Sequence, residues 1–172
     1  MQKNRTKNEH GFTLMESLIY VALFVVLSTV LIDSLIMMHR AYVDTRINRD
    51  LLDSAEVSME RMTREIRGSA SLDASGSAFG SDAGMLVLNT TDAGGSAKTE
   101  IFSVVSGAVS LTENGVVSGN LTGAKVVVDS LVFRNVTTLK GSAIKIEMTI
   151  HSVTAQSRTM SLSNMVAMRG GY

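Results

Sequence analysis

One apolar segment near the N-terminus, residues 12–38, constrains this chain more than any other feature of its sequence. The segment contains no lysine or arginine, and its only charged side chains are Glu16 and Asp33. Because an α-helix rises about 1.5 Å per residue, this segment would extend roughly 40 Å, enough to cross a hydrocarbon core of about 30 Å. The sequence therefore predicts that the N-terminal part of the chain is inserted in a membrane.

The residues before this segment indicate its orientation. They carry Lys3, Arg5 and Lys7 against one acid, Glu9, and basic residues beside the first apolar span favour a cytoplasmic N-terminus. A secretory signal peptide has an apolar region of about 7–15 residues followed by a small-x-small cleavage site, and this segment has neither property. A plain membrane anchor would explain the length and the basic flank, but not the acid at position 16.

Glu16 is unusual because it lies inside the apolar boundary. An acid near the middle of a membrane helix costs about 2.5–3.5 kcal/mol, and less near the end, so such a residue is by default functional and has a partner. Glu16 closes the motif Gly-Phe-Thr-Leu-Met-Glu, residues 11–16, between a short basic leader and a long apolar segment. In this arrangement the motif resembles the N-terminus of type IV prepilins and type II secretion pseudopilins.

The resemblance implies that a prepilin peptidase cuts between Gly11 and Phe12, and that the new N-terminal residue, Phe12, is N-methylated. Glu16 then becomes the fifth residue of the mature chain, where the family has a glutamate that contacts the neighbouring subunit and sets axial register in a filament. Physical chemistry agrees, because a buried carboxylate is tolerated when it pairs with a cation such as the new amine. Phe12 and Glu16 are also one helical turn apart, so pairing within one subunit and pairing between subunits both remain open.

The same resemblance implies a location and a set of partners. The chain would be a single-pass protein of the inner membrane with a cytoplasmic N-terminus, and after assembly part of a periplasmic or extracellular filament. Its partners would be the peptidase, membrane lipid, the inner-membrane assembly platform and other pilin or pseudopilin subunits. Adhesion, motility, DNA uptake and protein secretion all use such subunits, and the sequence does not choose among them.

The predicted helix continues well past the apolar segment. Neither glycine nor proline occurs between Phe12 and Arg67, and Gly68 is a suitable stop. We therefore expect one helix over residues 12–68, with residues 12–38 as the transmembrane and assembly segment. Its second half has a charged side, which we expect to be solvated, and one apolar stripe at steps of three or four residues: Ile47, Leu51, Ala55, Met59, Met62 and Ile66.

Residues 69–172 are predicted to form a globular, β-rich head. Ser106-Gly107 and Asn114-Gly115 are hairpin turn signals, whereas residues 68–84 have the composition of a connector with little to bury. A run of strands after a long helix indicates an α+β fold with a largely antiparallel sheet that covers the apolar stripe. The order of elements is similar to that of minor pilins and J-type pseudopilins. The candidate strands are 85–88, 99–105, 108–112, 116–117, 125–135, 143–151 and 158–168.

Several classes of function are not expected from this sequence. The chain has no cysteine, so it can form neither a disulfide nor a thiolate metal site. Its three histidines are isolated and no phosphate-binding or nucleophile motif occurs, so we expect no catalytic residues, no metal and no cofactor. Without residues 1–11 the chain has 13 basic and 15 acidic residues, which gives no electrostatic reason to bind nucleic acid. The prediction is a structural subunit and not an enzyme.

Two features favour a minor pilin or pseudopilin over a major pilin. Many major pilins close a C-terminal loop with a disulfide, and many carry a proline where this chain has Asp33; here both are absent. Asp33 itself has two interpretations, an acid that reaches water at the outer membrane surface or a contact with another subunit or assembly protein. The alternative functions are a major pilin that forms the bulk of a filament, and a membrane-anchored binding module that keeps residues 1–11 and does not polymerise.

Overall fold

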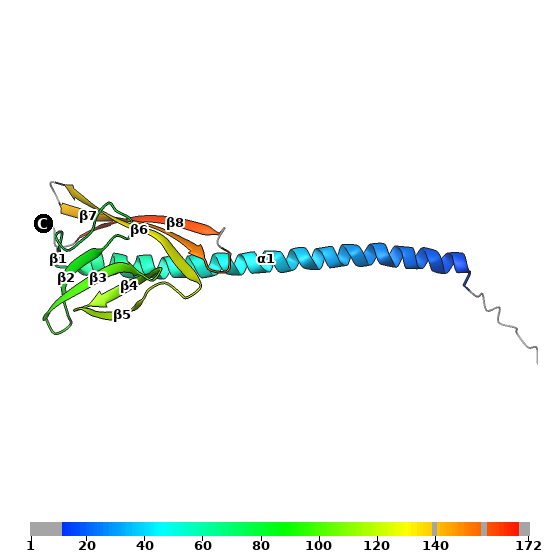
Figure 1. Cartoon of the computed structure of the whole chain (residues 1–172), viewed down its shortest axis with the longest axis horizontal. Helices are drawn as coiled ribbons and strands as arrows, with labels where there is room; N and C mark the ends of the chain where they lie inside the picture. Colours follow the sequence, from blue (N-terminus) through cyan, green and yellow to red (C-terminus); the bar gives the residue numbers. More distant parts are fainter. Residues whose placement is uncertain (1–11, 139–140, 156–157, 169–172) are drawn as a thin grey trace, which may run out of the picture. The chain divides into compact units, whose positions relative to one another are not determined.

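The computed structural model describes residues 12–138, 141–155 and 158–168 of the chain. Within these ranges one helix, α1 (Leu14–Gly68), precedes eight strands (Figure 1). The chain forms two compact units, Met1–Asp44 and Thr45–Tyr172, here called the N-terminal unit and the head unit. The strands are β1 (Ser71–Leu72), β2 (Leu86–Thr91), β3 (Ala97–Val105), β4 (Ala108–Glu113), β5 (Val116–Asn120), β6 (Val126–Thr138), β7 (Gly141–Ser152) and β8 (Thr159–Ala167).

The predicted helix is found as one continuous element of 55 residues, although it begins at Leu14 and not at Phe12. It contributes to both compact units, so the head unit contains the second half of α1 as well as the predicted β-rich residues 69–172. At the end of α1, the Ser69 hydroxyl donates a hydrogen bond of 2.8 Å to the Ile66 carbonyl oxygen. This bond satisfies one of the carbonyl groups that a helix end leaves without an intrahelical partner.

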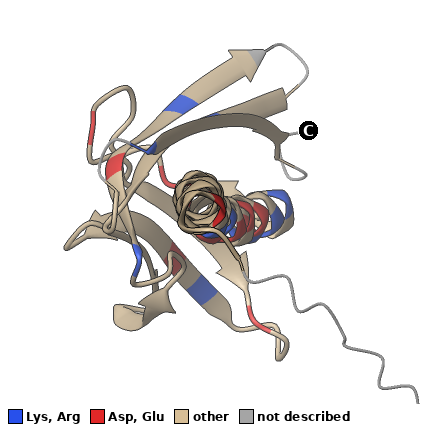
Figure 2. Cartoon of the chain, turned by 90° about the vertical axis from the view of Figure 1, so that its right-hand side faces the viewer, with Lys and Arg blue, Asp and Glu red and all other residues tan. Residues whose placement is uncertain are grey.

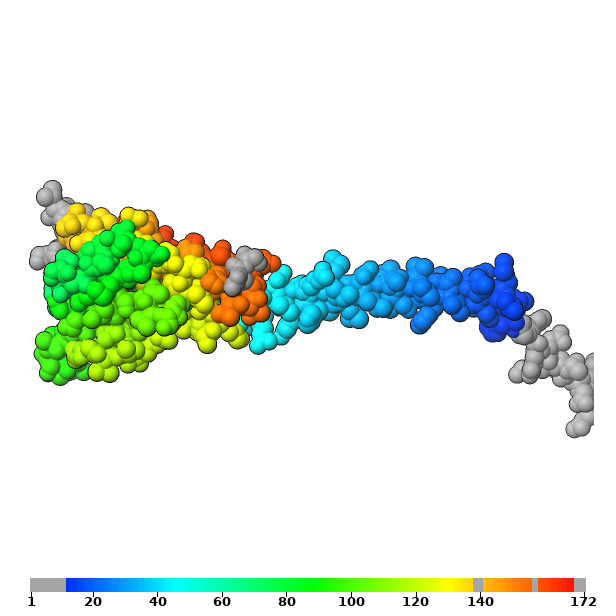
Figure 3. Space-filling view, in the orientation of Figure 1, coloured from blue at the N-terminus to red at the C-terminus, as the bar shows by residue number. Residues whose placement is uncertain are grey.

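The apolar side chains of the first half of α1 are exposed. Every large apolar residue from Phe12 to Met38 has at least 45% of its surface accessible, and Figure 3 shows this surface in the blue part of the chain. The segment is long and apolar enough to cross a membrane. A continuous apolar surface of this size is unfavourable in water and indicates contact with lipid or with another protein.

The second half of α1 buries the predicted apolar stripe. All six residues of that stripe are buried, and Leu51, Ala55, Met62 and Ile66 are at most 1% exposed. Ser58 lies among them with no exposed surface, and its hydroxyl donates to the Ser54 carbonyl oxygen at 2.7 Å. Because this bond satisfies the hydroxyl within the helix, a polar residue fits in the core without a partner from the sheets.

The strands form two antiparallel sheets, where the sequence suggested one small sheet. One sheet has the order β1-β2-β3-β4-β5 and the other the order β6-β7-β8. In Figure 2, viewed along α1, the two sheets lie on different sides of the helix. The fold is thus an α+β arrangement in which antiparallel sheets pack on a long helix, as predicted. The core residues of the sheets include Leu86, Leu88, Phe102, Leu111, Leu131, Phe133, Ile144, Ile146, Met148 and Ile150.

Both predicted hairpin turns are confirmed. Ser106 and Gly107 have φ values of 52° and 76°, and Asn114 and Gly115 have values of 49° and 81°. Two successive residues with positive φ define the turn whose twist matches that of the flanking strands. These turns join β3 to β4 and β4 to β5, and they fix the register of three adjacent strands.

The connector of residues 68–84 is more ordered than its composition suggests. It contains β1, and its Gly84 amide donates a hydrogen bond of 2.8 Å to the Leu131 carbonyl oxygen of β6. A Cβ atom at Gly84 would lie 2.8 Å from the same oxygen, so only glycine fits without a shift of the backbone. The connector therefore links the two sheets.

Candidate assembly site

The N-terminus of α1 is capped by Thr13. The Thr13 Oγ1 accepts a hydrogen bond of 3.3 Å from the Glu16 amide, and its carbonyl oxygen accepts one of 3.1 Å from the Ser17 amide. Threonine followed three residues later by glutamate is the sequence pattern of a capping box. Glu16 therefore lies in the first turn, where a negative charge is favourable next to the helix dipole. Our sequence reasoning missed this pattern, which the spacing alone could have revealed.

Glu16 lies on one face of α1 between two aromatic residues. Phe12, Glu16 and Tyr20 follow at steps of four, and the rings of Phe12 and Tyr20 have centroids 6.1 Å apart at an angle of 70°. The Tyr20 hydroxyl donates to Glu16 Oε1 at 3.4 Å. This distance is long for an O–H···O bond, so the interaction is weak and the carboxylate can accept stronger donors. Tyr20 was not identified from the sequence.

The predicted cleavage residues lie at the boundary of the described chain. Gly11 is outside the described residues, whereas Phe12 is described and is 74% exposed. Phe12 and Thr13 precede the helix, which begins at Leu14. The chain around the predicted cleavage bond on the Phe12 side is thus non-helical and accessible.

Asp33 lies near the C-terminal end of the apolar segment of α1. It is exposed, and in the described part of the chain its side chain forms no ion pair or hydrogen bond. The same holds for Arg40, seven residues later, which is the first arginine or lysine after Phe12. Among described residues, these two opposite charges near the end of the apolar segment are left without a partner in their own chain.

The head unit contains a group of five charged residues, here called the head charge cluster: Arg61, Glu65, Lys98, Glu100 and Glu113. Lys98 Nζ lies 2.8 Å from Glu100 Oε1 and 2.7 Å from Glu113 Oε1. Arg61 Nε lies 2.8 Å from Glu65 Oε1, although the N–H does not point directly at that oxygen, and an Arg61 terminal nitrogen lies 3.8 Å from Glu113. The cluster joins α1 to β3 and β4.

Burial and neighbouring charges shift the pKa values of two groups in this cluster. Glu100 is 2% exposed, and its Oε2 accepts no hydrogen bond from the described residues. The pKa of Glu65 is raised, first by burial and then by the nearby negative charge of Glu100, against the opposing effects of Arg61 and Lys98. Hydrogen bonds to Glu100 and Glu113 raise the pKa of Lys98 and keep it cationic. Both cations of the cluster lie within ion-pair distance of its carboxylates, an arrangement that links the helix to the sheet.

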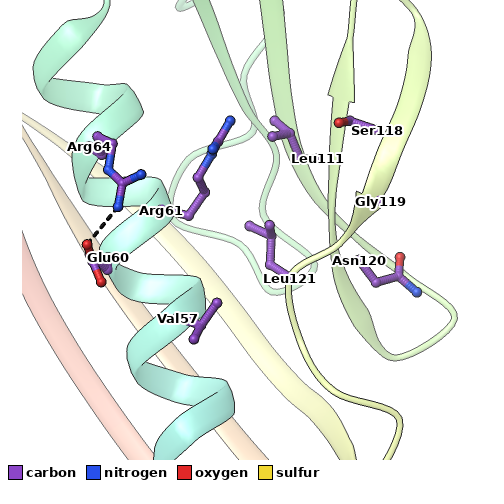
Figure 4. Close-up of a pocket in the computed structure, with 9 residues that line it drawn as sticks. All are labelled: Val57, Glu60, Arg61, Arg64, Leu111, Ser118, Gly119, Asn120 and Leu121. Carbon is purple, nitrogen blue, oxygen red and sulfur yellow. Dashed lines mark hydrogen bonds and ion pairs between the residues drawn. The ribbon is translucent and has the colours of Figure 1, made fainter.

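A cavity of about 420 Å³ lies between α1 and the β4–β5 hairpin (Figure 4). Arg61 points into it, and Arg64 lies at its edge in an ion pair with Glu60 at 2.6 Å. Val57, Leu111 and Leu121 supply apolar walls. Because Arg61 and Arg64 are each paired with an acid of their own helix, the cavity offers no unpaired cation to an anionic ligand.

Several other titratable side chains of the head unit have local partners. His151 Nδ1 lies 2.6 Å from Asp129 Oδ1, so this histidine is paired and not isolated as its sequence position suggested. In the described ranges no three metal-ligating side chains come together. The acids of residues 68–84 accept hydrogen bonds from backbone amides; for example, Asp73 Oδ1 accepts from the Ser75 and Gly76 amides at 3.0 Å.

Comparison with known proteins adds no further assignment. No family model matches this chain, and no curated protein and no solved structure is significantly similar to it. The residues at the N-terminus of α1 are therefore the basis for interpreting its function.

Proposed function

We propose that this chain is a structural subunit, a minor pilin or pseudopilin, of a type IV pilus or a type II secretion-like filament. The observation that carries the proposal is Glu16, an acid in the first turn of a helix whose first half has exposed apolar side chains. It directly follows the motif residues 11–15, which resemble a prepilin cleavage site. The chain is inserted in the inner membrane, loses residues 1–11 and assembles through the first half of α1.

The exposed surface of α1 supports this sequence of events. Its apolar residues need lipid around them, and they can exchange lipid for the helices of other subunits without meeting water. The same exchange would remove Glu16 from the membrane edge into an apolar bundle. Transfer of the carboxylate into the bundle is tolerated only when it pairs with a cation, because an unpaired buried charge costs several kcal/mol.

The amine that cleavage creates at Phe12 is the cation that fits this need. A free α-amino group is largely protonated at neutral pH. The only described side-chain contact of the Glu16 carboxylate is the weak bond from Tyr20, so the carboxylate keeps acceptor sites for an amine. In the proposed filament the amine of one subunit binds Glu16 of its neighbour.

Intact-mass measurement of the membrane-bound protein tests the processing step. We expect the wild-type chain to lack residues 1–11 and to carry one methyl group on Phe12. Gly11→Val adds a branched side chain at the cut bond and should leave the leader attached. Normal processing of Gly11→Val, or a wild-type chain that keeps residues 1–11, would contradict the proposal; the latter result is the one expected of an anchored binding module.

Quantifying subunits in sheared filaments tests the role of Glu16. Removal of one partner of a buried charge pair costs about 3–5 kcal/mol, and the low end applies at a wet membrane edge. Because about 1.4 kcal/mol is a factor of ten, Glu16→Ala should lower incorporation about a hundredfold at equal membrane levels. Ser17→Ala is the matched control, as it truncates the adjacent exposed residue without removing a charge. Equal incorporation of Glu16→Ala and wild type would refute the assembly role.

A further inference from the structure

We propose that Arg40 of one copy of this chain forms an ion pair with Asp33 of a second, parallel copy displaced by about 10 Å toward its head along the helix axis. The inference rests on the proposed function, because it requires that the first halves of α1 pack side by side. It adds a second contact between the copies, at the opposite end of the apolar segment from Glu16.

The two residues cannot satisfy each other within one helix. Asp33 and Arg40 are seven residues apart on the continuous α1, which corresponds to about 10.5 Å along the axis. Side chains of one helix meet at spacings of three or four residues, so a spacing of seven is too long. Both residues are exposed, and neither forms a side-chain ion pair or hydrogen bond with the described residues.

Asp33 needs a cation when the helices leave lipid for a protein bundle. It is followed by Ser34 and then by four apolar residues up to Met38, so packing of neighbouring helices would surround it mainly with apolar side chains. Arg40 is the first arginine or lysine after Phe12, and the next one, Arg46, is about 20 Å from the level of Asp33. Arg40 of a neighbouring copy is therefore the nearest guanidinium for Asp33 in a parallel assembly.

The displacement that joins Asp33 to Arg40 also fits the contact proposed for Glu16. The helix starts at Leu14, so Phe12 and Thr13 can either continue the helical rise or be extended. Measured along the helix axis, the nitrogen of Phe12 then lies about 6 Å from Glu16 in the first case and about 10 Å from it in the second, on the N-terminal side. When the second copy is shifted by about 10 Å toward its head, its amine reaches the level of Glu16 of the first copy. Its Asp33 then lies at the level of Arg40 of the first copy.

One contact between two copies therefore contains both ion pairs. The first copy supplies Glu16 and Arg40, and the displaced copy supplies the Phe12 amine and Asp33. In helices that supercoil at 3.5 residues per turn, the three heptads between Phe12 and Asp33 keep these two positions on one side. Glu16 and Arg40 are three heptads plus three residues apart, which on such helices turns Arg40 by about 50° from Glu16. The partner is a second copy of this chain, because its own charges are complementary at this displacement.

Charge variants test the pair in the full-length, membrane-bound chain. Asp33→Asn and Arg40→Gln should each lower incorporation into filaments about tenfold, since each leaves one charge without its partner. The charge swap Asp33→Arg with Arg40→Asp in the same chain should return incorporation to within about threefold of wild type, because the displaced copies again present opposite charges. Wild-type incorporation of both single variants, or a swap no better than the single variants, would overturn the proposal.

Cysteine crosslinking measures the displacement without changing either charge. The chain has no cysteine, so any disulfide comes from the introduced residues. Val30 and Met37 are exposed, seven residues apart and each three residues before one member of the pair. Two differently tagged copies with Val30→Cys and Met37→Cys should give the mixed dimer as the main product. A main product from two Val30→Cys copies would indicate no displacement and would overturn the proposal.

The two proposals fail in different ways. If Glu16→Ala is excluded from filaments while Asp33→Asn enters them normally, the filament function stands and the ion pair is wrong. If residues 1–11 are retained and Glu16→Ala behaves as wild type, the proposed function itself is wrong.

Discussion

The two halves of α1 differ in what covers their apolar side chains. Ile32, in the N-terminal unit, is 55% exposed, whereas Ile66, in the head unit, has no exposed surface. Both isoleucines belong to one continuous helix, so helix formation does not explain the difference. The second half carries one apolar stripe that two sheets of the same chain cover, while the first half is apolar on all sides and has no such cover. The first half of α1 is thus the part whose apolar surface the described residues leave uncovered.

Charged residues follow the same division. In the second half of α1, Asp50 binds Lys125 at 3.0 Å and Arg61 lies 2.8 Å from Glu65. In the first half, Glu16 has a weak bond from a tyrosine and Asp33 has no side-chain partner among the described residues. Several charges of the head unit are thus paired within that unit, whereas the N-terminal unit presents acids to its surroundings.

Truncation of one isoleucine in each half should give the largest contrast in stability. Ile66→Ala removes a fully buried side chain and should destabilise the head by about 2–5 kcal/mol. Ile32→Ala makes the same chemical change at an exposed site and should leave head stability unchanged within about 0.5 kcal/mol. Urea unfolding of the full chain in detergent micelles, followed by circular dichroism of the sheets, measures both. Similar losses in the two variants would contradict the division of α1.

Loss of the lysine in the head charge cluster should have the next largest effect. Lys98→Met leaves Glu100 buried without its cation, and we expect a loss of about 2 kcal/mol. Breaking a fully buried ion pair costs about 3–5 kcal/mol. We expect a smaller loss here because the Lys98 side chain is 21% exposed. Lys145→Met is the matched control, since Glu147 is one-third exposed and keeps Arg134 at 2.8 Å. Equal effects in the same unfolding assay would show that burial of Glu100 does not matter.

The sequence predicts the features of this fold that depend on local pattern. The extent of α1 follows from the absence of glycine and proline between Phe12 and Arg67, and the buried stripe follows from steps of three and four. The turns at Ser106-Gly107 and Asn114-Gly115 follow from residues that accept positive φ. Each of these signals depends on a few neighbouring residues, so one sequence is enough to read it.

Features that depend on distant residues were not predicted. The division into two sheets depends on β6 pairing with β7 and not with β5, which no local pattern encodes. The head charge cluster brings Arg61 and Glu65 of the helix to Lys98, Glu100 and Glu113, across more than thirty residues of chain. In the candidate site, Glu16 was identified because an acid is rare in an apolar segment. Its contact with Tyr20 was missed, although the spacing of four residues indicates it.

Acidity should affect the head through Glu65. Burial raises the Glu65 pKa above its ordinary value of 4.5, so the folded head holds this proton to a higher pH than the unfolded chain. The resulting stabilisation is complete below about pH 4.5 and is lost as the pH rises through the folded pKa. As the pH rises from about 4 to about 7, Glu65→Gln should therefore become more stable relative to the wild type. A constant difference over this range would contradict the raised pKa. The pKa of Glu147 is lowered by Lys145 and Arg134, but this residue is present in both proteins, so its contribution cancels in the stability difference.

The smallest effect is expected on the exposed side of the second half of α1. Glu60 and Arg64 form an ion pair of 2.6 Å with a spacing of four residues, yet their side chains are 72% and 60% exposed. Water screens such a pair, and the two long side chains lose rotamer freedom when they form it, so its coupling energy should be about 0.3–0.5 kcal/mol. A double-mutant cycle of Glu60→Ala and Arg64→Ala, measured by urea unfolding in micelles, gives this coupling directly. The value should also decrease at high salt, because exposed charges are screened. A coupling above about 1 kcal/mol that persists in salt would mean that this side of the helix is not simply solvated. In that case water would have less access to the cavity beside Arg64 than the exposure of its lining residues indicates. The charged side of α1 would then be shielded from solvent, as the buried stripe is.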